Sequence, residues 1–191
     1  KARVEFQPKG VIGIIGTWNF PVNTIFAPLA GIFAAGNRAM IKCSEVTPQT
    51  GELMEQLIAK YFKPEELVAI NGGPDVGASF SAAPFDHIIF TGATSIARHI
   101  MRAAADNLTP VTLELGGKSP VIISDSYPMN EAIERIVNGK ILNVGQVCLS
   151  PDYILVPEAK LEEFVSGTMN YLGTLFSSLL NNPDYSSVVN A

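Results

Sequence analysis

The sequence predicts an α/β protein with an open, mostly parallel sheet and helices on its faces. Short β-branched runs bounded by glycine, such as GVIGIIG (residues 10–16), are typical of strands buried on both faces. These runs alternate with segments of about 10–15 residues that carry apolar side chains at helical spacing, which is the pattern of successive βαβ units. Hydrophobic residues make up 47% of the chain, which suffices for a packed core.

The expected elements follow one another with little irregular sequence between them. Strands are expected, in chain order, over residues 10–16, 38–42, 66–70, the first part of 87–92 (which ends in a turn), 111–115, 120–124 and 152–157. Helices are expected over residues 22–36, 48–61, a short stretch ending near 80, 95–105, 130–142 and 159–172. Thr47 is expected as the N-cap of the second helix, with Pro48 in its first position.

The turn at Gly116-Gly117 is the best candidate for a boundary between two units. We therefore expect one domain over residues 1–113 and the beginning of a second over residues 114–191. The chain opens without Met and without a charged-then-apolar leader, so we expect a piece of a longer protein that carries no targeting segment.

Charge and cysteine content exclude several classes of partner. The chain has 13 Lys and Arg against 18 Asp and Glu, and no basic run, so nucleic acid is not expected as a partner. No apolar stretch reaches the roughly 20 residues of a membrane span. Cys43 and Cys148 lack the spacing of zinc ligands or of a disulfide framework, so no metal site is expected and a reducing, cytoplasmic location is the simpler expectation.

Cys148 allows two interpretations. A lone cysteine among apolar residues is usually a small core side chain. Cys148, however, follows GQV and precedes SPDYILV, at an expected junction of helix and strand. Free backbone N–H groups at such a junction can lower a thiol pKa and stabilise an oxyanion, so a nucleophile is the alternative.

Two more polar residues follow expected strands. Asn19, in TWNFP, either satisfies its own turn or points its amide toward a carbonyl oxygen. Glu114, in LELGGKSP, is a carboxylate in an apolar strand end; burial there would raise its pKa and suit it to deprotonating water. The alternative for Glu114 is a paired glutamate at a turn, with Lys118 as its partner. His87 and His99 are interpreted as structural.

A nucleotide site is suggested at two other strand ends. Lys42 and Glu45, in IKCSE, are either a solvated pair or the donor and acceptor for a ribose diol, where an acid disfavours a 2′-phosphate. FTGAT (residues 90–94) runs from strand into helix, where backbone N–H groups can meet a pyrophosphate. The GxGxxG fingerprint of dinucleotide-binding folds is missing from the sequence.

The order of these motifs is more specific than any one of them. TWNFP, IKCSE, FTGAT, LELGGKSP and GQVCLSPDYILVP together resemble the aldehyde dehydrogenase superfamily, from about Val4 onward. The sequence around Cys148, GQVCLSPDYILVP, and the tail LLNNPDYSSVVNA most resemble the class 3 and coniferyl aldehyde dehydrogenase branch. The resemblance implies a Rossmann-like NAD(P)-binding domain over residues 1–113 and the start of a catalytic domain over residues 114–191.

The resemblance also implies roles for the candidate residues. Cys148 matches the thiol that attacks an aldehyde, Asn19 the side chain that stabilises the adduct, and Glu114 the base that activates water. The resulting reaction is oxidation of an aldehyde, with an aromatic one as an option, to the acid through a thiohemiacetal and a thioester. The implied cofactor is NAD, with NADP accepted in this branch, and the implied assembly is a homodimer or higher homo-oligomer. The implied cofactor contacts are Lys42, Glu45, Thr91, Gly92, Ala93, Trp18 and Leu115.

Departures from the family pattern leave alternatives open. Members usually carry Pro at position 43, Ser at 93 and Gly at 97, and Ala97 is expected to border the pyrophosphate and to weaken or shift cofactor binding. The family's amino-terminal helices, and its later segment with the substrate funnel and a dimerising strand, have no counterpart here. A reductase of acyl-phosphates or acyl-CoA, and an inactive nucleotide-binding fragment, are the other two hypotheses.

Overall fold

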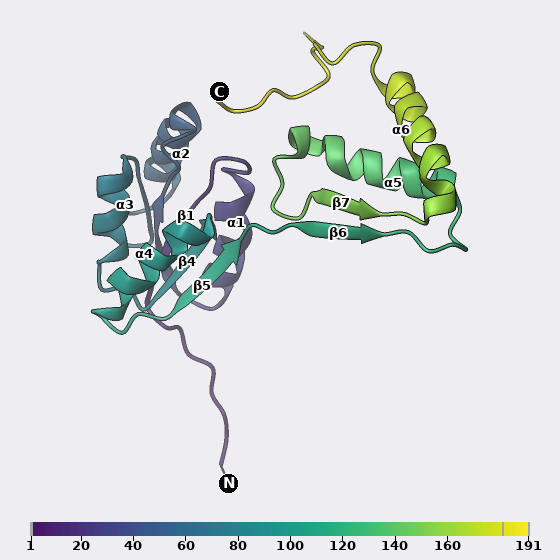
Figure 1. Ribbon diagram of the computed structural model, residues 1–191. Coiled ribbons are helices and arrows are strands. Elements are labelled where there is room, and N and C mark those ends of the chain that lie inside the picture. Colours follow the sequence, from purple (N-terminus) through teal and green to yellow (C-terminus); the bar gives the residue numbers. More distant parts are fainter. Residues whose placement is uncertain (1, 181, 191) are drawn as a thin grey trace. The chain divides into compact units, whose positions relative to one another are not determined.

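The computed structural model describes residues 2–180 and 182–190 and divides into two compact units, Lys1–Leu115 and Gly116–Ala191 (Figure 1). The predicted α/β class, with a mostly parallel sheet and flanking helices, is confirmed. The division between the units falls at the Gly116-Gly117 turn. Each unit is described by itself below.

The first unit is built on a five-stranded parallel sheet in the order β3-β2-β1-β4-β5. The strands are β1 (Val11–Ile15), β2 (Arg38–Lys42), β3 (Leu67–Ile70), β4 (His87–Gly92) and β5 (Val111–Leu115). The chain enters at the central strand, moves out to β3 and returns past β1 to β4 and β5. This order is that of a doubly wound sheet, which binds ligands beyond the carboxyl ends of its strands.

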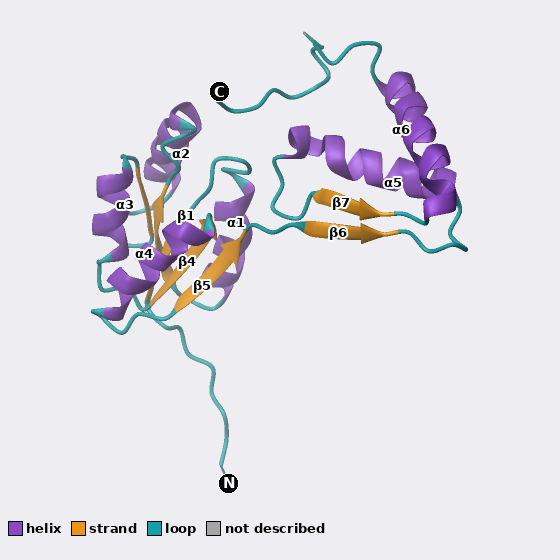
Figure 2. Ribbon diagram, in the orientation of Figure 1, coloured by secondary structure: helices purple, strands orange, loops and turns teal. Residues whose placement is uncertain are grey.

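Helices cover both faces of this sheet (Figure 2). They are α1 (Asn23–Ala34), α2 (Pro48–Tyr61), α3 (Pro74–Ser81) and α4 (Thr94–Ala105). One core packs α1 and α2 against the sheet around Ile14 and Ile41, and the other packs α3 and α4 around Ile88 and Phe90. Because both faces are covered, the strands are apolar on both sides, as the uninterrupted β-branched runs indicated.

The expected boundaries agree closely with the observed elements. Two strands were expected over the observed residues at both ends, β2 and β5, whereas β4 extends through Gly92, where a turn was expected. Pro48 is the first residue of α2, as expected, but Thr47 makes no side-chain capping hydrogen bond. Thr47 is thus the N-cap residue, as expected, but its backbone, with φ −122° and ψ 62°, departs from the extended geometry from which a capping hydroxyl reaches the first turn.

The second unit contains two parallel strands, β6 (Ser119–Ile122) and β7 (Pro151–Leu155). Its helices are α5 (Met129–Ile141), the 3₁₀ segments Leu142–Gly145 and Glu158–Lys160, and α6 (Leu161–Leu175). The core between strands and helices contains Ile123, Ile133 and Phe164. Among the described residues, no helix is long and apolar enough to cross a membrane.

Candidate functional site

The predicted site residues of the first unit gather at one edge of its sheet. All five strands are parallel, so their carboxyl ends meet there. Lys42 is the last residue of β2 and lies level with Ile15 of β1. Across the neighbouring pair, Thr91 is level with Glu114, and Gly92 with Leu115. The half-buried Trp18 and Asn19 follow the end of β1 at the same edge.

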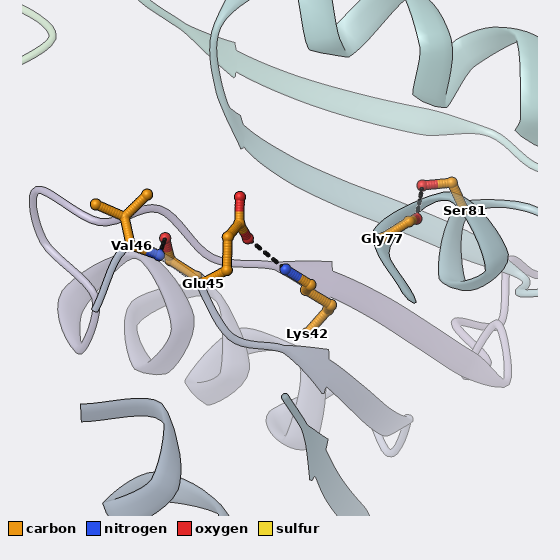
Figure 3. Close-up of polar contacts among 6 residues, drawn as sticks. Lys42, Glu45, Val46, Gly77 and Ser81 are labelled. Carbon is orange, nitrogen blue, oxygen red and sulfur yellow. Dashed lines mark hydrogen bonds and ion pairs between the residues drawn. The ribbon is translucent and has the colours of Figure 1, made fainter. Parts of the chain in front are cut away.

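Lys42 and Glu45 form an ion pair at this edge, with 2.5 Å between Nζ and Oε2 (Figure 3). The side chain of Lys42 is only 4% exposed, whereas that of Glu45 is 46% exposed. The hypothesis of a solvated pair is therefore wrong for Lys42. A buried ammonium requires a partner, and Glu45 supplies it while keeping its own carboxylate accessible to a ligand.

The backbone around Lys42 is fixed from both sides. The N–H of Gly16 donates to the carbonyl of Lys42 at 3.0 Å, and the N–H of Cys43 donates to the carbonyl of Ile70 at 3.1 Å. These bonds extend the ladders that join β2 to β1 and to β3. The end of β2 is thus held inside the sheet, which places the lysine stem in a defined position.

The electrostatics of the pair keep Glu45 charged. Partial burial alone would raise the pKa of Glu45, but the hydrogen bond and the positive charge of Lys42 outweigh it and hold the pKa below its usual range. Glu45 is therefore a carboxylate at neutral pH. A carboxylate accepts hydrogen bonds and an ammonium donates them, which is the complement of two adjacent hydroxyl groups.

A residue that the sequence did not single out lies beside this pair. Gly77, on α3, is placed so that a Cβ there would lie 3.9 Å from Cε of Lys42. The hydroxyl of Ser81 donates to the carbonyl of Gly77 at 2.8 Å, within the same helix (Figure 3). α3 therefore runs along the stem of Lys42. The segment NGGPDVGASF had predicted only a turn and a short helix, because nothing local in it indicates a neighbour on β2.

Thr91 and Gly92 end β4, and Ala93 alone connects them to α4. Ala93 is exposed and is the N-cap residue of α4, where it offers no capping side chain. The first N–H groups of an uncapped helix carry partial positive charge and need acceptors from elsewhere. This geometry suits a phosphate group, as FTGAT had indicated.

Ala97 does not lie where it was expected. It is 2% exposed and packs in the core with Ile100 and Ala104, on the buried stripe of α4. The expectation that its methyl group borders a pyrophosphate was therefore wrong. The helical period explains the difference, because Ala97 belongs to the face that turns toward the sheet.

Glu114 is exposed, so the expectation of a buried carboxylate was wrong. β5 is an edge strand, and its alternating pleat directs Val111 and Leu113 into the core beneath α4 while Glu114 points to the opposite face. Lys118, considered as a partner of Glu114, instead forms an ion pair with Asp152 at 3.1 Å.

The two cysteines are in opposite environments. Cys148, in the second unit, is exposed in a turn ahead of β7, where the N–H of Ser150 donates to the carbonyl of Val147 at 3.1 Å. The core interpretation is therefore wrong for Cys148. Cys43 is buried, and burial raises its thiol pKa to about 11 even though the charge of Lys42 opposes this shift. Of the two, only Cys148 is placed to attack a ligand.

His87 lies away from these residues. It is the first residue of β4, at the amino end of the sheet, and its Nε2 is 2.8 Å from Oγ1 of Thr112. It lines a cavity of about 270 Å³ together with Lys9 and Pro28. Burial and the charge of Lys9 lower the pKa of His87. None of the predicted site residues lines this cavity.

The structure therefore gathers the predicted nucleotide residues, with Asn19 and Glu114, at one edge of the first unit. Cys148 belongs to the second unit.

Known proteins match this chain along its length. The profile of the Aldehyde dehydrogenase family matches residues 1–185. The coniferyl aldehyde dehydrogenase of Pseudomonas sp. (strain HR199 / DSM 7063) is 59% identical over 191 residues, which are 100% of this chain and 40% of that protein. The predicted resemblance to the coniferyl branch is thereby confirmed.

Solved structures agree with the sequence match. The substrate-bound state of Staphylococcus aureus AldH is similar with a TM-score of 0.93 and 38% identity, over 96% of this chain and 40% of that one. The C291A mutant of aldehyde dehydrogenase C from Pseudomonas syringae, in complex with NAD+ and octanal, has a TM-score of 0.82 and 34% identity, over 88% and 35% of the two chains. The present chain thus spans about two fifths of the length of such relatives. The motifs, the doubly wound sheet and these matches together show that the chain belongs to the aldehyde dehydrogenase family.

Proposed function

We propose that the whole protein containing this chain oxidises an aldehyde, of the aromatic coniferyl type, to the carboxylic acid with NAD as cofactor. The observation that carries the proposal is the exposed thiol of Cys148, in the GQVC motif of a chain that belongs to the aldehyde dehydrogenase family. The substrate class rests on the 59% identity to a coniferyl aldehyde dehydrogenase.

Residues 1–113 form the cofactor domain in this proposal, and residues 114–191 begin the catalytic one. Lys42 and Glu45 hold the two ribose hydroxyls, the ammonium as donor and the carboxylate as acceptor. The uncapped start of α4, together with Thr91, Gly92 and Ala93 that lead into it, takes the pyrophosphate.

Residues at the same carboxyl edge of the sheet make the further cofactor contacts and favour one cofactor over the other. Trp18 and Leu115 complete the contacts at the strand ends. The charge of Glu45 repels a 2′-phosphate and so favours NAD over NADP. Support for NAD comes from the Pseudomonas syringae relative, which was crystallised with NAD+.

Cys148 performs the first chemical step. After the thiol proton has passed to water, the sulfur attacks the carbonyl carbon of the aldehyde, a C–S bond forms, and the carbonyl π electrons move to the oxygen. The amide of Asn19 and the backbone N–H of Cys148 donate hydrogen bonds to that oxyanion, a kind of contact worth about 3–4 kcal/mol in the transition state. The nicotinamide, when bound, supplies an acceptor for the hydride that the adduct loses, and a thioester remains on Cys148.

Glu114 then acts as the base in hydrolysis of the thioester. Its carboxylate takes a proton from a water molecule, whose oxygen attacks the thioester carbonyl. The C–S bond breaks, the acid leaves, and the proton returns to the Cys148 sulfur. The exposed position of Glu114 at the end of β5 gives the carboxylate access to water, so this role does not depend on the burial that was expected.

The test is a pair of cysteine substitutions in the whole protein. Cys148→Ala is expected to reduce aldehyde-dependent NADH formation by about 10³-fold or more, because the nucleophile is lost. Calorimetry with NAD is expected to give the wild-type affinity, since Cys148 takes no part in nucleotide binding. Cys43→Ala is the matched control and should retain turnover, because Cys43 is buried in the core. Wild-type turnover in the Cys148→Ala variant would refute the proposed mechanism.

A further inference from the structure

We propose that Gln146 is a positioning residue, which holds the turn bearing Cys148 by pinning it to the tail of the chain at residues 187–189. The inference deepens the proposed function and rests on it, because it concerns the placement of the proposed nucleophile. It begins from an unusual stretch of backbone between α5 and β7.

That stretch adopts left-handed conformations at three successive residues. Asn143 has φ 50° and ψ 35°, Val144 has φ 58° and ψ 28°, and Gly145 has φ 73°. Glycine and asparagine accept this region readily, but a β-branched valine does so at a cost in free energy. Such a backbone persists only where neighbouring interactions hold it.

Gln146 supplies such interactions, and two of them are hydrogen bonds to the first left-handed residue, Asn143. Its backbone N–H and its side-chain Nε2 both donate to the carbonyl oxygen of Asn143, each at 3.0 Å. One carbonyl thus accepts two hydrogen bonds from one residue. The left-handed segment is closed by Gln146 itself.

The same side chain reaches the tail of the chain. Its Nε2 donates to the carbonyl of Ser187 at 3.3 Å, and its Oε1 accepts from the N–H of Val189 at 3.1 Å. A side-chain amide that donates to one backbone group and accepts from a nearby one reproduces the pairing of two strands. The partners are 41 and 43 residues away in sequence, so the contact fixes the tail against the turn.

The tail is ordered by further contacts before it reaches Gln146. The ring of Tyr185 lies 5.0 Å from that of Phe176, centroid to centroid. The N–H of Asp184 donates to Oδ1 of Asn182 at 2.9 Å. The tail therefore presents residues 187–189 to Gln146 from an anchored turn.

The consequence concerns Cys148, two residues after Gln146. The intervening backbone is short, so any displacement of Gln146 moves the N–H and the sulfur of Cys148. In the proposed reaction both groups act on the same carbonyl, and a displacement of about 1 Å can reduce such a rate about a hundredfold. A glutamine that only stabilised the fold would instead affect unfolding without a selective loss in the chemical step.

The test uses two pairs of variants in the whole protein. Gln146→Met keeps the length of the side chain and removes the amide, and Gln146→Glu keeps the acceptor and removes both donors. Val189→Pro deletes the N–H that Oε1 accepts from, although its ring also restricts the backbone at Val189 and at the residue before it. Val189→Ala is the matched control, because it shortens the side chain and keeps that N–H. The tail pair decides the question if a Gln146 variant fails to fold, since Val189 is exposed.

The expected result is a split between chemistry and binding. Gln146→Met and Val189→Pro should lower kcat by about tenfold to a hundredfold with an unchanged Kd for NAD, and hydrogen exchange at residues 143–150 should become faster. Gln146→Glu should resemble Gln146→Met, and Val189→Ala should resemble the wild type.

Wild-type kcat and exchange in Gln146→Met, or equal damage from Val189→Ala and Val189→Pro, would overturn the inference. The exchange measurement does not depend on turnover. It therefore tests the role of Gln146 even if Cys148→Ala shows that the proposed function is wrong.

Discussion

The two units use the same elements but differ in how completely they are covered. In the first, helices pack on both faces of a five-stranded sheet, and Ile14, Ile41 and Ile88 are fully buried. In the second, α5 and α6 cover one face of a two-stranded sheet, and the side chains of Ile122, Tyr153 and Leu155 are 74%, 49% and 53% exposed. The second unit thus has an uncovered apolar sheet face, whereas helices cover both faces of the sheet in the first unit.

This difference indicates which unit buries its own sheet and which leaves one sheet face uncovered. A two-stranded sheet is marginally stable in water, and large apolar side chains gathered on one surface mark a place where other protein packs. The first unit carries the proposed nucleotide site on a sheet covered on both faces, whereas the second carries the proposed nucleophile on a partly covered one. Three measurements would sharpen this contrast or break it.

The largest expected difference is in thiol reactivity. With a pKa of about 11, Cys43 is ionised to only about 0.1% at pH 8, and it is also buried. Cys148 is exposed. We expect iodoacetamide to modify Cys148 at least about a hundredfold faster than Cys43 in the native chain, as followed by mass spectrometry of the two peptides. The difference should vanish in concentrated urea. Equal native rates would mean that the first unit opens as readily as the second.

The next difference is in the cost of truncating an isoleucine. Ile14→Ala removes a fully buried side chain from the central strand and should lower the free energy of unfolding by about 2–5 kcal/mol. Ile122→Ala acts at an exposed position of β6 and should change it by less than about 0.5 kcal/mol. Urea unfolding of the 191-residue chain measures both. A large cost at Ile122 would show that its face is covered in solution.

The smallest expected effect is on how the stability of the first unit responds to acid, with and without the carboxylate of Glu45. The pKa of Glu45 is lowered in the folded state, so its contribution to stability is present above the unfolded pKa of about 4.3 and is lost as pH falls through the folded value. Wild-type protein should therefore lose more stability than Glu45→Gln between pH 5 and pH 3. Because Glu45 is half exposed, the excess should stay below about 1 kcal/mol.

Lys42→Met is the matched control for this measurement, since it removes the cause of the shift and should abolish the same excess. An unaltered pH dependence in both variants would contradict the ion pair.

Local sequence predicted most of the first unit. Its strands are mostly apolar and its helices periodic, so pattern alone located the ends of β2 and β5 and brought Lys42 and Glu45 to one strand end. The exposure of Glu114 was not predictable in the same way, because it depends on β5 being an edge strand. Sequence identifies strands more readily than their order in a sheet.

The second unit was less predictable near its candidate nucleophile. A helix was expected through Leu142, but α5 ends at Ile141 and a valine adopts left-handed geometry three residues later. Local preference argues against such geometry for valine. The contacts that close it come from Gln146, and those that fix Gln146 come from Ser187 and Val189 in the tail. Interactions across such a separation leave no periodic pattern to detect.

The burial of Lys42 has a consequence for how the protein responds to dissolved salt. Mobile ions screen charges that face solvent, and the Debye length is only about 8 Å at physiological ionic strength. The exposed pair of Lys118 with Asp152 should therefore weaken as electrolyte is added. Lys42 is enclosed by protein, so salt should weaken its attraction for the half-exposed Glu45 less than it weakens the exposed pair.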